Sequence, residues 1–117
     1  MRLAILGPMG ALVSGAVADT FTTYTTCPAR GGNCDSSKSV WWNVWGQARP
    51  FNANAHCRDP FIPGVTEVCM DWGSNSAFFR TTTGQKRCLR KESSRSVTRC
   101  AAVNVCYFDT WVEIACL

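Results

Sequence analysis

The chain has 117 residues, of which 46% are hydrophobic, and a formal net charge of +4 at pH 7. This length suits a single domain, because chains divide into several domains only at greater lengths. The cysteines include no closely spaced Cys-x-x-Cys pair, and His56 is the one histidine in the sequence. This pattern excludes the usual zinc motifs, so we expect neither a metal ion nor another cofactor.

Residues 1–18 have the composition of a secretory signal peptide. Arg2 precedes a largely apolar run, and the small residues Ala16 and Ala18 stand just before Asp19. Such a segment is removed on export, and this one is too short and too rich in glycine for a membrane span. The alternative is an N-terminal strand. We predict a secreted, extracellular protein with one disulfide-rich domain at residues 19–117.

Short extended segments separated by turn residues predict an all-β fold for this domain. In chain order they are Thr20–Thr26, Val65–Trp72, Ala77–Thr83, Lys86–Lys91, Ser96–Ala102, Val105–Phe108 and Thr110–Leu117. Alternation of apolar and polar residues, with many β-branched and aromatic side chains, favours strands. Proline and asparagine make Arg49–Gly64 a long irregular segment held at Cys57. We expect about six to eight short antiparallel strands in a small sandwich or barrel, with one short helix allowed.

Three tryptophans lie close together, at Trp41, Trp42 and Trp45. On a strand, Trp41 and Trp45 project from one face and Trp42 from the other; on a helix, Trp41 and Trp45 also share a face. The aromatic and β-branched content favours the strand. Two interpretations are open. Either both faces are buried in a small core, or Trp41 and Trp45 form an exposed platform for sugar rings or an apolar partner.

The eight cysteines all lie in the predicted exported domain. An even number at this density in a short exported chain predicts a disulfide framework. The pairing is not determined by the sequence, and one hypothesis joins Cys27 to Cys116 so that both ends of the domain are held. The cysteines are Cys27, Cys34, Cys57, Cys69, Cys88, Cys100, Cys106 and Cys116.

Dispersed cysteines without Cys-Cys doublets, abundant Thr, Ser and Gly, and a basic charge balance define the exported segment. In this layout the chain resembles the small secreted cysteine-rich proteins of filamentous fungi, and it differs from hydrophobins, hevein-like chitin binders and plant lipid-transfer proteins, which carry such doublets. The resemblance implies an effector-like or toxin-like protein that acts on a host or competitor outside the producing cell. It assigns no functional residue.

A basic cluster lies in the C-terminal half, where Glu92 is the one acid between positions 80 and 99. Clustered Lys and Arg attract anionic partners, and the alternative is an ordinary solvated surface. We expect a monomer that binds an unknown target through a rigid aromatic and basic surface; an anionic membrane surface, an acidic glycan or a protein receptor fits better than nucleic acid. The predicted binding residues are Trp41, Trp45, Arg80, Lys86, Arg87, Arg90, Lys91 and Arg95, and Arg99 completes the cluster.

No complete catalytic motif is present, so binding is favoured over catalysis. A ribonuclease-like alternative would use His56 as general acid, Glu67 or Glu113 as base, and an arginine such as Arg58 or Arg80 on the phosphate. Nothing in the spacing brings these residues together. A module that binds cell-wall glycans is the other alternative.

Overall fold

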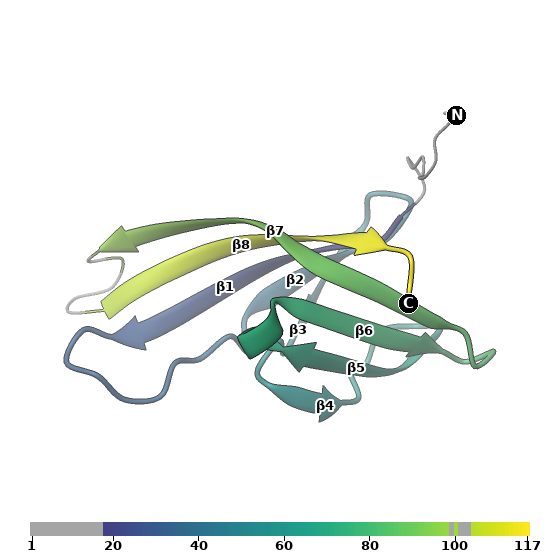
Figure 1. The fold of residues 1–117 in the computed structure, drawn as a ribbon, viewed down its shortest axis with the longest axis horizontal. Coiled ribbons are helices and arrows are strands. Elements are labelled where there is room, and N and C mark those ends of the chain that lie inside the picture. Colours follow the sequence, from purple (N-terminus) through teal and green to yellow (C-terminus); the bar gives the residue numbers. More distant parts are fainter. Residues whose placement is uncertain (1–17, 99, 101–103) are drawn as a thin grey trace.

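The computed structural model describes residues 18–98, 100 and 104–117, and the predicted signal residues 1–17 lie outside them (Figure 1). The expected all-β fold is confirmed. No helix among the described residues has the length and hydropathy of a membrane span. The elements are β1 (Thr20–Pro28), β2 (Ser39–Trp42), β3 (Ala48–Phe51), β4 (His56–Arg58), β5 (Val65–Asp71), the 3-10 turn η1 (Trp72–Ser74), β6 (Ser76–Thr81), β7 (Lys86–Thr98) and β8 (Asn104–Ile114).

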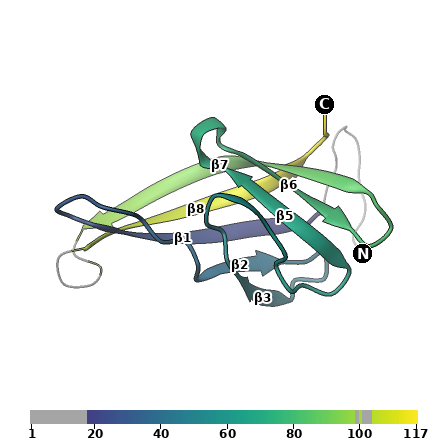
Figure 2. The same ribbon diagram turned by 90° about the horizontal axis from the view of Figure 1, so that it is seen from below.

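The eight strands form one antiparallel sheet in the order β3-β2-β1-β8-β7-β6-β5-β4. The edge strands β3 and β4 follow one another in the chain and are joined by residues 52–55 alone. In a flat sheet of this size the edges would lie about 34 Å apart, at about 4.8 Å per strand. The connection spans at most about 18 Å. The sheet therefore curls into a half-barrel, as Figures 1 and 2 show.

The core fills the concave side of the sheet. The strand register places Trp41, Phe21 and Trp111 side by side on β2, β1 and β8, and each is at most 1% exposed. The Phe21 ring lies 4.5 Å from the Trp41 ring and 4.8 Å from the Phe51 ring, measured between centroids. Large aromatic side chains supply much of the buried area of a small domain. The cluster is Phe21, Trp41, Phe51, Ala53, Ile62, Val68, Met70, Ala77, Phe79, Leu89 and Trp111.

Two details of the strands differ from the sequence-based expectation. The predicted segment Lys86–Lys91 and residues 96–98 of the next predicted segment belong to the single strand β7, because a register shift between Lys91 and Ser93 lets it continue along β8. The predicted segment Val105–Phe108 and residues 110–114 of the last predicted segment likewise share one strand, β8. The segment expected to be irregular contributes the two edge strands, β3 and β4. Pro50 lies in β3, where an edge position leaves its missing N–H without consequence for the ladder.

All eight cysteines form disulfides, as predicted. The hypothetical bridge between Cys27 and Cys116 is wrong. Cys27 lies opposite Val105 near the start of β8, whereas Cys116 follows Ile114 beyond the other end of that strand. The sulfur atoms of Cys27 and Cys116 are thus separated by about the length of β8. The bridges are Cys27–Cys34, Cys57–Cys69, Cys88–Cys116 and Cys100–Cys106.

Candidate functional site

The two tryptophans proposed as a platform lie in different environments. Trp41 is 1% exposed, and its Nε1–H donates to Asp19 Oδ2 over 2.9 Å inside the barrel. Trp45 follows the end of β2, in the turn to β3, and is 82% exposed. The partly exposed tryptophan of β2 is Trp42, whose Nε1–H donates to Thr22 Oγ1. Trp41 and Trp45 therefore do not form a stacking pair.

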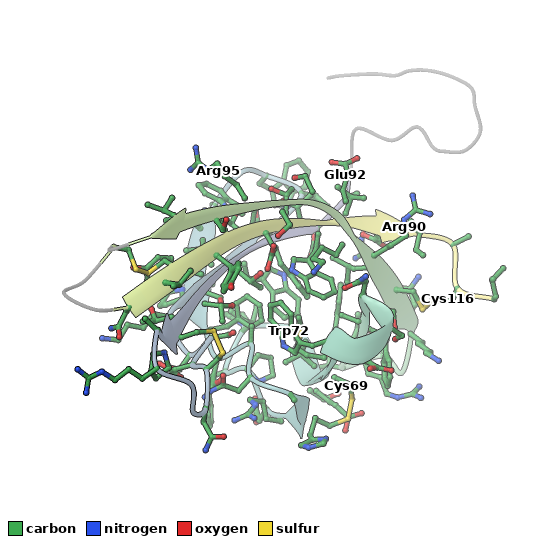
Figure 3. The ribbon with its side chains drawn as sticks, turned by 60° about the vertical axis from the view of Figure 1, so that its left-hand side comes forward. Cys69, Trp72, Arg90, Glu92, Arg95 and Cys116 are labelled. Atoms are coloured by element: carbon green, nitrogen blue, oxygen red, sulfur yellow. A yellow bond between two sulfur atoms is a disulfide. The ribbon has the colours of Figure 1, made fainter. Side chains whose placement is uncertain are left out.

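The predicted basic cluster is divided by the strand register. Alternate residues of a strand point to opposite faces, so Arg87 points into the barrel while its neighbours on β7 point outward. Lys91 lies over the Trp72 ring, and Arg95 lies over the Phe108 ring of β8. Figure 3 shows Arg95 and Arg90 on separate parts of β7. Arg99 lies outside the described residues. The outer face of β6 and β7 carries Arg80, Lys86 and Arg90.

Of these three cations, Lys86 lines a groove of about 710 Å³ on the outside of the sheet. Arg80 lies opposite Lys86 and Arg90 lies opposite the lining residue Ser76, so both are next to the groove. On the outer face of the sheet, one side chain from each of β4, β5, β6, β7 and β8 lies in a single row across the strands. In strand order the row is Cys57, Cys69, Phe78, Cys88 and Ile114. The C-terminal segment after β8 forms one wall. We call this the outer groove, and its lining includes Cys57, Cys69, Phe78, Lys86, Ile114 and Cys116.

Two disulfides fix the walls of the outer groove. Cys57 and Cys69 are directly opposite on β4 and β5, with their Cα atoms 4.0 Å apart. Cys88 and Cys116 tie the C-terminal segment to β7 across a Cα separation of 5.2 Å. Both walls are therefore held covalently before any ligand arrives. A preformed site loses less conformational entropy on binding than a flexible one.

One rim of the outer groove carries cations over an aromatic ring. The Lys86 ammonium lies 4.5 Å from the Phe78 ring centroid, and the Arg80 guanidinium carbon lies 5.4 Å from it. Arg80 Nε is also 3.6 Å from Glu67 Oε1, so its charge is partly neutralised. Within residues 18–98, 100 and 104–117, no carboxylate lies within 4.0 Å of Lys86. Lys86 is thus available to an anion at the edge of an apolar floor.

Asp71 and Ser76 line the other rim, on β5 and β6, and Arg90 lies opposite Ser76 on β7, just outside the lining. Asp71 caps the turn η1, where its side chain accepts a hydrogen bond from the Ser74 amide. Arg90 is exposed and points away from the sheet (Figure 3). A ligand lying across the groove would therefore meet the Lys86 ammonium at one rim, and at the other rim the Asp71 carboxylate with the neighbouring Arg90 guanidinium.

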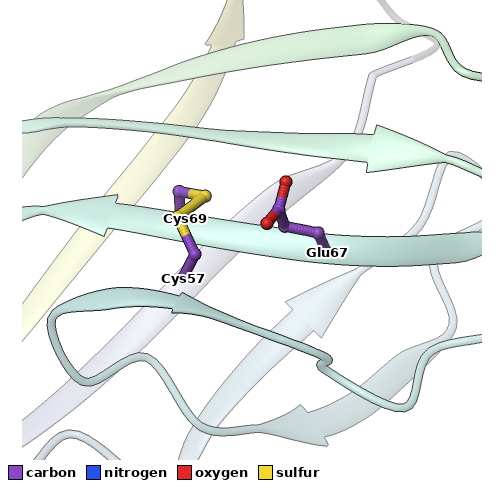
Figure 4. A group of neighbouring side chains, drawn as sticks. All are labelled: Cys57, Glu67 and Cys69. Atoms are coloured by element: carbon purple, nitrogen blue, oxygen red, sulfur yellow. A yellow bond between two sulfur atoms is a disulfide. The ribbon is translucent and has the colours of Figure 1, made fainter.

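The groove also adjoins a group of potential metal ligands, Cys57, Glu67 and Cys69, whose ligand atoms lie within 4.8 Å of one another (Figure 4). A cysteine binds metal as a thiolate. Here the two sulfurs are bonded to each other, so neither offers one. With Glu67 also facing Arg80, this group does not support a metal site.

The structure does not assemble the ribonuclease-like set. His56 is exposed on the edge strand β4, with a positive φ of 78°. Glu113 accepts hydrogen bonds from the inward-pointing Arg87, and Glu67 pairs with Arg80 on the outer face. The two candidate bases are thus each occupied by an arginine, on opposite faces of the sheet.

Phe78 is one of the outer-groove residues that the sequence analysis missed. A signal for it exists in the alternation of three neighbouring strands, because Cys69, Phe78 and Cys88 all lie on the face of the sheet opposite the core.

Comparisons with protein-family models, curated proteins and solved structures find no match for this chain.

Proposed function

We propose that the protein is secreted and binds, in the outer groove, a ligand that combines an apolar body with an anionic group. The observation that carries this proposal is the Lys86 ammonium over the Phe78 ring, with no ion pair among the described residues, at the edge of a disulfide-walled apolar floor. Four disulfides stabilise the domain and suit an oxidising compartment outside the cell. The resemblance in layout to small secreted cysteine-rich fungal proteins supports an effector-like or toxin-like role.

The chemistry of the floor favours a lipid over a glycan. Sulfur atoms, the Phe78 ring and the Ile114 side chain offer apolar contact, whereas a sugar's hydroxyl groups would lose hydrogen bonds to water there without replacement. The groove volume of about 710 Å³ lies within the range of small-molecule sites. Lys86 at the rim would contact the acidic headgroup. We therefore assign anionic lipid at a membrane surface as the partner.

Vesicle sedimentation tests this proposal. The protein should bind vesicles of phosphatidylcholine mixed with phosphatidylglycerol, bind pure phosphatidylcholine weakly, and lose affinity as salt rises. Lys86→Gln should weaken binding about fivefold, since one basic residue near an anionic surface contributes about 1 kcal/mol. Lys38→Gln is the matched control: it removes the same charge from an exposed residue in the segment between β1 and β2, outside the groove.

Three results would contradict the assignment. Equal loss in both lysine variants would mean that total charge, and not the outer groove, governs binding. Preference for an acidic polysaccharide over vesicles would replace the lipid by a glycan. Cleavage of RNA by the purified protein, abolished in His56→Ala, would replace binding by catalysis.

A further inference from the structure

A second polar network lies inside the barrel, where β1 begins. Glu113 on β8 accepts hydrogen bonds from Arg87 Nε over 2.6 Å and from Arg87 Nη2 over 2.5 Å. Its Oε1 also accepts the backbone N–H of Asp19 over 3.1 Å. The Asp19 carboxylate in turn accepts the Trp41 indole N–H over 2.9 Å. Four side chains and one backbone nitrogen thus form a continuous network at the start of the domain.

The charges of this network do not balance in an uncleaved chain. Glu113 and Asp19 are two carboxylates, and among the residues that the structure describes Arg87 is the one cation that acts on Asp19. Asp19 is 8% exposed, and burial, partly offset by its Trp41 bond, raises the pKa of its carboxyl group above 3.8. A buried carboxylate without a full positive partner is costly. One more cation beside Glu113 would neutralise the network.

We propose that hydrolysis of the peptide bond between Ala18 and Asp19 supplies that cation, and that Glu113 is the receptor for the new N-terminus. Water adds across the bond, Ala18 leaves with the carboxylate, and the Asp19 nitrogen gains protons to become an ammonium. This nitrogen already lies 3.1 Å from Glu113 Oε1. The amide hydrogen bond becomes a charge-assisted one, which is stronger. The new N-terminal ammonium is then held in the folded domain by its hydrogen bond to Glu113.

The position of the cleavage matters because β1 fixes the register immediately afterwards. Thr20 is paired with Trp42 on β2 and with Val112 on β8, and this register fixes the position of the Asp19 nitrogen relative to Glu113. A chain that starts one residue earlier has the same net charge but returns an amide to this position. The inference depends on the predicted signal cleavage and is independent of the proposed lipid binding.

The test compares three disulfide-intact proteins: one that starts at Asp19, the same chain acetylated on its α-amine, and one that starts at Ala18. Urea unfolding, in which the denaturant does not screen charge, should give the first a folding equilibrium constant about tenfold larger than either of the others. Glu113→Gln should remove the difference between the free and acetylated forms. Because that variant risks misfolding, the rate at which an amine-reactive ester modifies the Asp19 amine provides a second measurement, and we expect at least tenfold protection relative to the unfolded chain.

Equal stability of the three forms would overturn the inference, as would a difference that persists in Glu113→Gln. An Asp19 amine that reacts as fast as in the unfolded chain would also overturn it. Protein collected after secretion should begin at Asp19 by N-terminal sequencing, and another first residue would contradict the proposed cleavage. Vesicle binding is unaffected by these outcomes, so the two proposals fail separately.

Discussion

Of the four disulfides, Cys88–Cys116 joins the residues that are farthest apart in the sequence, so its removal should destabilise the domain most. The bridge joins residues 28 positions apart, and closing a loop of that length in the unfolded chain corresponds to about 3.6 kcal/mol. The total stability of a domain of this size is about 5–15 kcal/mol. Cys88 is half-buried and Cys116 exposed, so serine fits at both positions without burying an unpaired hydroxyl. The double serine variant therefore isolates the effect of the cross-link.

The assay is guanidinium unfolding of the double serine variant, with thiol titration to show that the other bridges are intact. The matched control removes Cys27–Cys34, which spans 7 positions and should cost about 2.5 kcal/mol. We expect the Cys88–Cys116 variant to be less stable than the control by about 1 kcal/mol. A loss below about 1 kcal/mol, or a larger loss in the control, would refute the loop-closure reasoning.

Three further predictions concern single residues. Phe21→Ala should cost about 3–5 kcal/mol in urea unfolding, because it leaves a cavity between Trp41 and Trp111; an effect below about 1 kcal/mol would contradict the packing. Trp45→Ala should change stability by less than about 0.5 kcal/mol, since this side chain is 82% exposed. In the N-acetylated chain starting at Asp19, the raised pKa of that carboxyl stabilises the fold below pH 3.8 and the effect is lost as pH rises through the raised value. Asp19→Asn should remove this pH dependence in urea titrations, while its amide oxygen still accepts the Trp41 bond.

Alternation along the sequence was enough to predict the strands that have one buried face. In β1, Phe21, Thr23 and Thr25 are buried and their neighbours are not, as a period of two requires. The same signal marks β6, where Ala77 and Phe79 point inward. The edge strands escaped this reasoning, because β3 has one buried residue and β4 none, so neither shows a pattern.

The face on which each tryptophan lies depends on pairing, which a single segment does not encode. Trp41 and Trp42 are adjacent and equally apolar, and a shift of one residue in register would exchange their positions. The structure places Trp41 inward because it is opposite Phe21, which is itself opposite Trp111. The partners are far apart in sequence, so neither the buried row nor the disulfide pairing was predictable from local pattern.

The basic residues form a cluster in the sequence, but strand pairing distributes them over different surfaces of the domain. Between Lys86 and Arg90, the intervening Arg87 points into the barrel to meet Glu113. Phe78, which completes the rim, comes from another strand. Long-range register, together with two disulfides, thus determines which cations face the outer groove.

The most direct measurement is a nuclear magnetic resonance titration of isotope-labelled, disulfide-intact protein with a soluble short-chain phosphatidylglycerol. If the outer groove binds the lipid, the largest shift changes should occur at Phe78, Lys86 and Ile114, and Lys86→Gln should weaken them. Shift changes centred on Arg95 and Phe108, or none at lipid concentrations that saturate vesicle binding, would contradict the assignment.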